Sequence, residues 1–265
     1  MNIAAIRRTF LLSTLSLVLG TALVGQAVAG DQLQKIKDSK TIKVGLEGTY
    51  PPFSFVDADG KLTGFEVEFS NALAKELGVK ADIQPTKWDG ILAALESKRL
   101  DVVINQVTIS DERKKKYDFS EPYTISGIQA LTAKKNAGKF PTPESLSGHK
   151  VGVGLGTNYE QWLKEHVPGA IVKTYDDDPT KFQDLMVGRT DAILVDRLAA
   201  LEETKKTGDK LAVSGDAFSR QEAGIAIRKG EPETVAAVNA AIDKLRADGT
   251  LAKLSQKYFG SDVTK

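Results

Sequence analysis

Arg113 and Thr108 carry the chemistry that the sequence displays most directly, because both follow an apolar strand predicted over residues 102–105. Ser110 suits the N-cap of a short helix, and such a helix turns Arg113 back over the end of the strand. A guanidinium fork beside a hydroxyl and free backbone amides is what a carboxylate ligand needs. The alternative is that Arg113 joins the lysines at 114–116 on a solvated face, and spacing alone favours that alternative.

Asp196 ends a second apolar strand, predicted over residues 192–195, at the position that Gln106 occupies after the first. A carboxylate facing Arg113 would hold an ammonium group while Arg113 holds a carboxylate, and the two charges together would recognise an α-amino acid. Asp196 is explained equally well as the N-cap of a helix over residues 197–201.

Thr157 and Asn158 follow a third strand through a glycine-rich turn and begin a helix. Thr157 and Glu160 fit a capping box, so the remaining free N–H groups of this helix suit an anion such as a carboxylate. The glycines at 152, 154 and 156 superficially suggest a dinucleotide-binding turn, but the third glycine of that fingerprint is absent. The nucleotide interpretation is therefore weak.

Glu47 and Tyr50 lie in the segment GLEGTYPPFSF (45–55), directly after a strand predicted over residues 42–46. Its two prolines stiffen a partly apolar wall, to which Glu47 adds a negative charge. Trp88 stands between polar residues just before a predicted helix. Each aromatic side chain has two interpretations that the sequence leaves open, namely core packing or a surface on which a ligand stacks.

The elements that must position these residues alternate between strand and helix, which indicates an α/β fold. One of the predicted helices begins with Asp178 as N-cap and Pro179 as its first residue. Two parts of the chain also repeat each other in order. Residues 95–106 align with 185–196 through matched Leu, Arg and Asp, and residues 44–50 resemble 153–159. We therefore expect two similar α/β lobes with a ligand cleft at the carboxyl ends of their strands.

Composition limits the classes of function. Residues 1–29 are predicted to be a signal peptide, because two arginines precede an apolar run that ends in Ala-Val-Ala. The chain has 36 basic and 35 acidic residues, which argues against binding nucleic acid or membranes through bulk charge. Cysteine is absent, so a disulfide, a thiolate metal site and a cysteine nucleophile are excluded. We expect a monomeric periplasmic protein with no metal and no cofactor.

The chain resembles the polar-amino-acid solute-binding proteins of bacterial ABC importers (family 3), and among them the members that bind L-cystine. The resemblance covers the chain after the predicted signal peptide and rests on residues 45–55, 64–69, 87–90, 103–113, 151–159, 175–179 and 191–196. It implies a two-lobe periplasmic binding protein fold of type II, with the ligand in the cleft between the lobes. Lobe 1 would comprise residues 30–125 and 222–265, and lobe 2 residues 126–221. Two crossover strands, near residues 122–127 and 218–224, would form a hinge.

The resemblance also implies a role for each candidate residue. Arg113 would bind the ligand α-carboxylate with help from Thr108 and the backbone of Thr157 and Asn158. Asp196 and the Gln106 carbonyl would bind the α-ammonium. Tyr50 and Trp88 would enclose the ligand side chain, and Glu47 would meet its polar end. Family members carry two serines where this chain has Asn105 and Gln106, so the side-chain contacts at that point stay open.

The family implies a membrane permease as the partner, which accepts the ligand from the closed protein. The same fold also includes periplasmic dehydratases, which need a positioned acid or base in the cleft. Here Arg113 and Asp196 already have binding roles, and His149 and His166 lie away from the predicted strand ends. We therefore predict a binding protein and no enzyme, with another polar or diamino amino acid as the alternative ligand.

Overall fold

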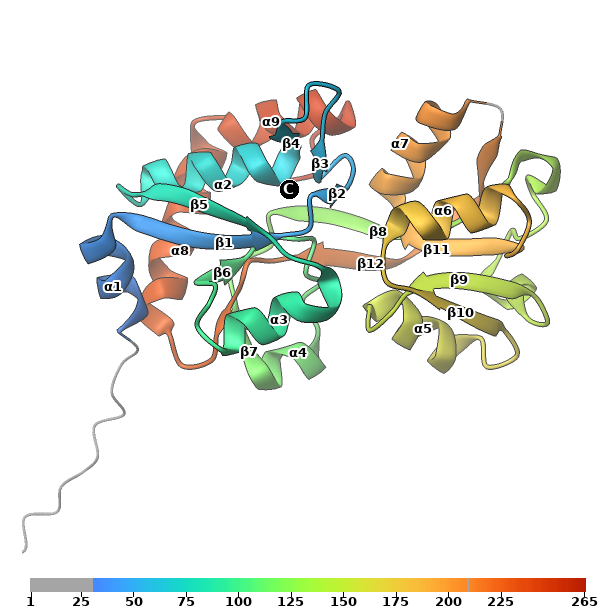
Figure 1. The fold of residues 1–265 in the computed structure, drawn as a ribbon, viewed down its shortest axis with the longest axis horizontal. Coiled ribbons are helices and arrows are strands. Elements are labelled where there is room, and N and C mark those ends of the chain that lie inside the picture. The colour runs from blue at the N-terminus through green and yellow to red at the C-terminus, as the bar shows by residue number, and fades with distance from the viewer. Residues whose placement is uncertain (1–30, 209) are drawn as a thin grey trace, which may run out of the picture.

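Two five-stranded sheets form the frame of the protein, of which the computed structural model describes residues 31–208 and 210–265. The predicted signal peptide lies outside the described residues. The two sheets stand side by side in Figure 1, each with helices on both faces. No helix in the described part of the chain is long and apolar enough to cross a membrane.

The first sheet has the strand order β5-β1-β6-β13-β7. Strand β1 pairs in parallel with β5 and β6, whereas β13 runs antiparallel to β6 and β7. Its strands are β1 (Thr41–Leu46), β5 (Lys80–Pro85), β6 (Val102–Val103), β7 (Tyr117–Phe119) and β13 (Ala226–Arg228). Its helices are α1 (Gln32–Ser39), α2 (Phe65–Glu76), α3 (Trp88–Glu96), α4 (Asp111–Lys116), α8 (Pro232–Ala247) and α9 (Thr250–Phe259).

Both faces of this sheet are buried, as the apolar runs of its strands require. Val44 and Val102 pack in one core with α2, α8 and α9, whereas Val103 and Ala226 pack in a second core with α3. Successive strand residues point to opposite faces, so neighbours in the sequence enter different cores. This two-sided packing fixes the strand ends from which the candidate side chains project.

The second sheet has the order β10-β9-β11-β8-β12. Its strands are β8 (Thr124–Ala133), β9 (Lys150–Gly154), β10 (Ile171–Tyr175), β11 (Ala192–Asp196) and β12 (Leu211–Ala223). Its helices are α5 (Asn158–His166), α6 (Asp178–Met186) and α7 (Arg197–Thr207), with short 3-10 turns η1 (Lys134–Asn136) and η2 (Pro143–Leu146). A small antiparallel sheet, β2 (Thr49–Tyr50), β3 (Ser54–Val56) and β4 (Leu62–Thr63), carries Tyr50.

The predicted internal repeat is confirmed by the topology, because the two sheets share one order of pairing. In each sheet the first strand of the unit, β1 or β9, lies between two strands parallel to it. The two strands beyond one of these partners are each antiparallel to the strand before them, in the order β6-β13-β7 in one sheet and β11-β8-β12 in the other. The matched aspartates also play the same part. Asp101 accepts a hydrogen bond of 2.9 Å from the Lys43 amide, and Asp191 accepts one of 2.9 Å from the Lys150 amide.

Strands β8 and β12 run together from the second sheet towards the first (Figure 1). They stay paired as far as Thr124 and Ala223, and Ala223 forms an isolated antiparallel bridge with Thr108 beside the first sheet. The division into lobe 1 (30–125 and 222–265) and lobe 2 (126–221) is a proposal that agrees with this course of the chain.

Three details differ from the sequence predictions. The strand predicted over 102–105 ends at Val103, and the chain leaves the extended conformation by Gln106, whose backbone is left-handed with φ of 48°. The N-cap of α6 is Asp177, not Asp178 as its place before Pro179 suggests. The long strand β12 escapes prediction because its sequence, LAVSGDAFSRQEA, keeps no apolar alternation over its second half.

Candidate functional site

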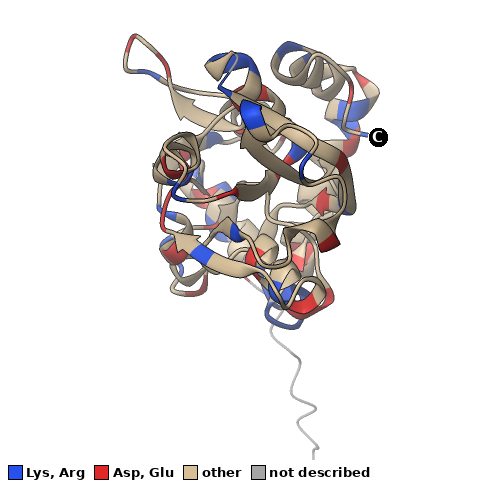
Figure 2. Ribbon diagram, turned by 90° about the vertical axis from the view of Figure 1, so that its right-hand side faces the viewer, with Lys and Arg blue, Asp and Glu red and all other residues tan. Residues whose placement is uncertain are grey.

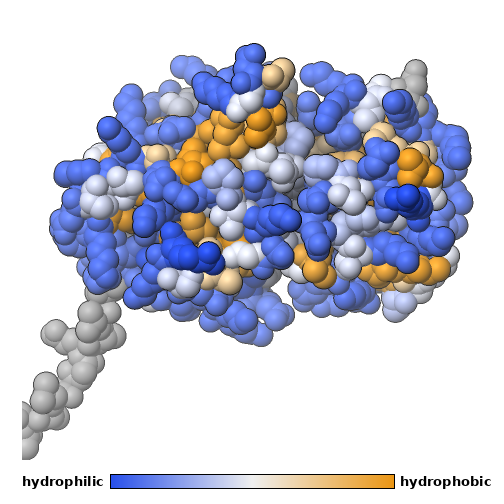
Figure 3. Space-filling model, in the orientation of Figure 1, coloured by the Kyte–Doolittle hydropathy of each residue, from blue (hydrophilic) through white to orange (hydrophobic). Residues whose placement is uncertain are grey.

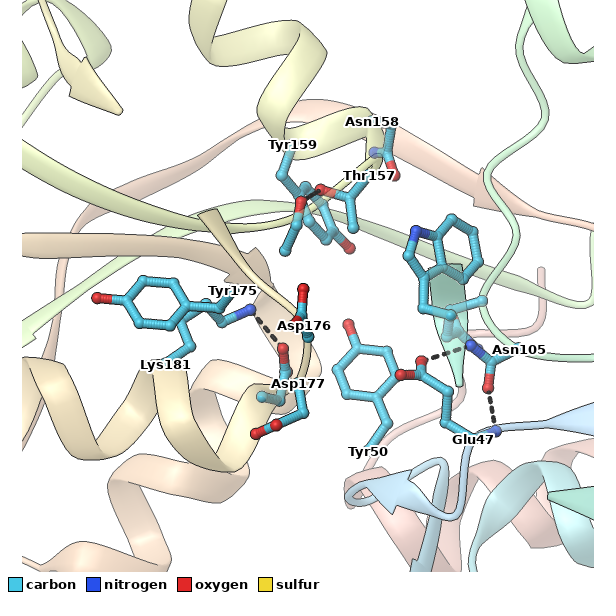
Figure 4. Close-up of a pocket in the computed structure, with 14 residues that line it drawn as sticks. Glu47, Tyr50, Asn105, Thr157, Asn158, Tyr159, Tyr175, Asp176, Asp177 and Lys181 are labelled. Atoms are coloured by element: carbon cyan, nitrogen blue, oxygen red, sulfur yellow. Dashed lines mark hydrogen bonds and ion pairs between the residues drawn. The ribbon is translucent and has the colours of Figure 1, made fainter. Parts of the chain in front are cut away.

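A cavity lies where the strand ends of the first sheet meet α5 and α6 of the second (Figure 4). Six of the nine predicted site residues line it, namely Glu47, Tyr50, Trp88, Gln106, Thr157 and Asn158. The other lining residues were not among the predicted site residues and are Asn105, Gly154, Tyr159, Tyr175, Asp176, Asp177, Asp178 and Lys181. Thr108, Arg113 and Asp196 are not among the lining residues. Arg113 lies against the lining residue Trp88, and Thr108 is linked to the lining residue Asn158 through Gln221.

Glu47 is held in place by Asn105. The Asn105 amide donates a hydrogen bond of 2.7 Å to the Glu47 carboxylate, and the Glu47 backbone N–H donates one of 2.8 Å to the Asn105 side-chain oxygen. Burial raises the pKa of Glu47 to about 7, although the bond from Asn105 acts to lower it. A carboxylate with so high a pKa gains much from a cation placed beside it.

Gln106 turns its side chain away from the cavity into the protein. Its Nε2 donates a hydrogen bond of 3.1 Å to the buried Glu66 carboxylate, and its Oε1 accepts one of 3.0 Å from the Thr124 hydroxyl. The Gln106 backbone N–H is also bonded to Glu66, at 2.7 Å. Its backbone carbonyl is therefore the polar group of Gln106 that remains for a ligand.

Four aromatic residues line the cavity, namely Tyr50, Trp88, Tyr159 and Tyr175, and the first three bear on the predictions. Tyr50 and Tyr159 are both buried and come from opposite sides, the first from β2 and the second from α5 (Figure 4). Burial raises the pKa of each hydroxyl well above 10, and the negative charge of Asp196 acts on both in the same direction. The third is Trp88, the first residue of α3. Both rings predicted from the sequence thus belong to the cavity wall, although Tyr50 also packs in an apolar core.

Arg113 lies behind Trp88, with its guanidinium carbon 5.3 Å from the centre of the indole ring. Its Nη1 donates a hydrogen bond of 3.0 Å to the Thr108 carbonyl, and Ser110 caps the helix by accepting from the Arg113 N–H at 3.2 Å, as predicted. Burial lowers the pKa of Arg113. Among the described residues no carboxylate forms an ion pair with it. A desolvated guanidinium without a protein counter-ion is suited to an anionic ligand.

Asp196 is buried, with 2% of its surface exposed. One carboxylate oxygen accepts hydrogen bonds from the Leu198 N–H at 2.7 Å and the Ser126 hydroxyl at 2.9 Å. The prediction that it caps the following helix is therefore confirmed. Burial raises its pKa to about 6, which these bonds only partly offset. An ammonium ligand would relieve the burial of this charge.

The start of α5 is joined to the first sheet through Gln221, a residue that the sequence did not reveal. The Gln221 side-chain oxygen accepts hydrogen bonds from the Asn158 amide at 2.6 Å and from the Thr108 hydroxyl at 3.1 Å. Thr157 caps α5 as predicted, accepting from the Glu160 N–H at 3.3 Å. The Glu160 carboxylate bonds the Gly156 N–H at 2.7 Å, one residue before the cap.

Lys181 and Asp178 form an ion pair on the wall that α6 contributes, with Nζ and Oδ1 separated by 2.5 Å. The sequence interpretation missed Asp178 because it assigned this residue to the helix cap, and it missed Lys181 because nothing in the sequence distinguishes it from an exposed helical lysine. The structure gives that role to Asp177, whose carboxylate accepts from the Thr180 N–H at 2.8 Å. The Asp178 side chain is thereby available to the cavity.

Comparisons with known proteins agree with this geometry. The model of the bacterial extracellular solute-binding proteins, family 3, matches residues 42–261. The L-cystine-binding protein TcyJ of Escherichia coli is 62% identical over 266 residues, which cover all of both chains. The L-cystine-binding protein TcyA of Bacillus subtilis is 39% identical over 238 residues, 89% of this chain and 87% of that protein.

The fold of this chain is also similar to that of a solved structure. The crystal structure of the ancestral amino acid-binding protein AncCDT-1, described as a precursor of cyclohexadienyl dehydratase, has a TM-score of 0.80 and 41% identity. The match covers 86% of this chain and 99% of that one.

Proposed function

Because the chain belongs to the bacterial extracellular solute-binding proteins of family 3, we propose that it binds L-cystine in the periplasm and delivers it to the permease of an ABC importer. The observation that carries this proposal is 62% identity to an L-cystine-binding protein along the whole length of both chains. Its relatives are binding proteins, so the chain is a binding protein and no enzyme.

The charged groups in the cavity wall and next to it support the proposal. At one end, the desolvated Arg113 would bind an α-carboxylate together with the free N–H groups at the start of α5. The buried Asp196 and the Gln106 carbonyl would hold the α-ammonium of the same end of the ligand. Tyr50 and Trp88 would flank the apolar disulfide, and Glu47 would face the second ammonium.

A ligand screen tests the proposal. Cystine should stabilise the protein more than cysteine, serine, arginine, glutamine or diaminopimelate at the same concentration, measured as the rise in melting temperature. A ligand that binds only the native state adds about 4 kcal/mol at a thousandfold excess over Kd. A larger shift with arginine or glutamine would overturn cystine as the ligand and leave the family unchanged.

Closure of the lobes about β8 and β12 is the motion that we propose to follow binding. Gln221 lies in β12 and contacts Thr108 on one side and Asn158 on the other, so it joins the two halves near the hinge. We expect the radius of gyration from small-angle X-ray scattering to fall when cystine is added. Identical scattering with and without saturating cystine would contradict a hinge at these strands.

A further inference from the structure

Lys181 is an ammonium group inside the protein, with 2% of its side chain exposed, on the wall of the cavity (Figure 4). Burying a charge is costly unless it is paired, and a buried pair has to recover the hydration that both ions lose. Among the described residues, Lys181 forms an ion pair with Asp178. The lysines of ion pairs with the same spacing elsewhere are exposed, such as Lys206, which is 66% exposed although its partner Glu203 is buried.

Asp178 does not use its full capacity for hydrogen bonds. Its Oδ1 meets Lys181, but its Oδ2 is buried and has no partner among the described residues. A buried carboxylate oxygen that accepts nothing costs free energy of the order of 1–3 kcal/mol or more. The helix does not need this side chain either, because Asp177 caps it. The fold therefore leaves one carboxylate oxygen of Asp178 without a hydrogen-bond donor, and it gives the Lys181 ammonium a single ionic partner among the described residues.

Glu47 belongs to the same end of the cavity from the other side. Its carboxylate responds to both charges of the pair, because Asp178 raises its pKa and Lys181 lowers it. Figure 4 shows Glu47 and Lys181 on different walls of one space, with Tyr50 between their elements. This end therefore combines one cation with two carboxylates, a set that matches an ammonium and a carboxylate on neighbouring atoms of a ligand.

Most other charges of the molecule are placed differently from Lys181 and Asp178. Basic and acidic residues alternate along the ribbon in the view of Figure 2, and Figure 3 shows several groups of apolar residues among hydrophilic ones on the face it presents. The pair of Lys181 and Asp178 differs from these charges because it lies on a cavity wall that Glu47 also lines, with Lys181 only 2% exposed.

We infer that Lys181 binds the distal carboxylate of cystine, an inference that rests on the proposed function. The free oxygen of Asp178 and the Glu47 carboxylate then bind the distal ammonium. Cystine ends in a second zwitterion, which a cavity cannot bury without partners for both charges. The distal end would then distinguish cystine from amino acids that have one charged end. A site built to pair a polar group rejects analogues that leave its own groups unpaired.

Three ligands separate the two distal charges. Cystine carries both, the mixed disulfide of cysteine with cysteamine lacks the distal carboxylate, and the mixed disulfide with 3-mercaptopropionate lacks the distal ammonium. Calorimetry on the wild-type protein should show at least about 30-fold weaker binding when the carboxylate is missing. Equal affinity for cystine and the cysteamine disulfide would overturn the inference without any variant.

Lys181→Met should weaken cystine binding by about 30-fold or more and change the affinity for the cysteamine disulfide by less than about threefold. Lys206→Met is the matched control, because Lys206 also pairs with an acidic residue three positions earlier but lies in solvent. Glu47→Gln should show the reverse preference, losing affinity for cystine and little for the 3-mercaptopropionate disulfide.

The outcomes separate the two proposals. A wild-type protein that does not bind cystine contradicts the proposed function itself. A wild type that binds cystine, with Lys181→Met losing both ligands equally, shows that Lys181 is structural and overturns the inference alone. Lys181→Arg keeps a cation and should retain part of the preference for cystine over the cysteamine disulfide. Because that preference is a ratio within one preparation, partial unfolding of a variant does not alter it.

Discussion

Arg113→Ala should weaken cystine binding by roughly 2–5 kcal/mol, because it leaves a ligand carboxylate buried without its cation. The structure gives the reason for so large an effect. Arg113 is desolvated, fixed by Trp88 and the Thr108 carbonyl, and forms no ion pair with the described carboxylates. Isothermal calorimetry with cystine measures the loss.

Lys114→Ala is the matched control, since Lys114 is the exposed neighbour on the same short helix. It should bind cystine as the wild type does and melt at nearly the same temperature, as surface substitutions usually do. Unchanged affinity in Arg113→Ala would remove Arg113 from the site. It would restore the interpretation in which Arg113 belongs with the lysines of its helix.

The sequence predicted the framework well because local signals set it. Ser110, Thr157 and Asp196 each stand before a helix as good N-caps, and each caps its helix in the structure. The repeated Leu, Arg and Asp pattern reflects two sheets with one pairing order, and the matched aspartates Asp101 and Asp191 bond corresponding strand amides. Signals of this kind act within a few residues or recur along the chain.

The missed part of the cavity depends on contacts between distant segments. Gln221 joins Thr108 and Asn158 across separations of 113 and 63 residues, which no local pattern reveals. Lys181 looks like an ordinary helical lysine until the fold buries it. Asp178 was misassigned because three successive aspartates precede Pro179, and only the backbone geometry shows that Asp177 caps the helix. The sequence therefore could not predict the site residues whose contacts are made with segments far away in the chain.

Asp196→Asn should reduce cystine affinity by about 2–5 kcal/mol while the fold stays intact. Asparagine is as good an N-cap as aspartate, and its side-chain oxygen can still accept from Leu198 and Ser126, so the variant removes the charge and keeps the shape. Far-ultraviolet circular dichroism and the melting temperature should stay close to those of the wild type.

The same variant should also change how binding depends on pH. Burial raises the pKa of Asp196 from 3.8 to about 6 in the free protein, and an ammonium beside it favours the ionised form, so binding lowers this pKa and releases a proton. Wild-type affinity should therefore fall as the pH drops through about 6, and Asp196→Asn should lose this component of the dependence. Normal affinity together with an unchanged pH profile would leave Asp196 as a helix cap only, because a cap needs an acceptor oxygen whereas an ammonium site needs the charge.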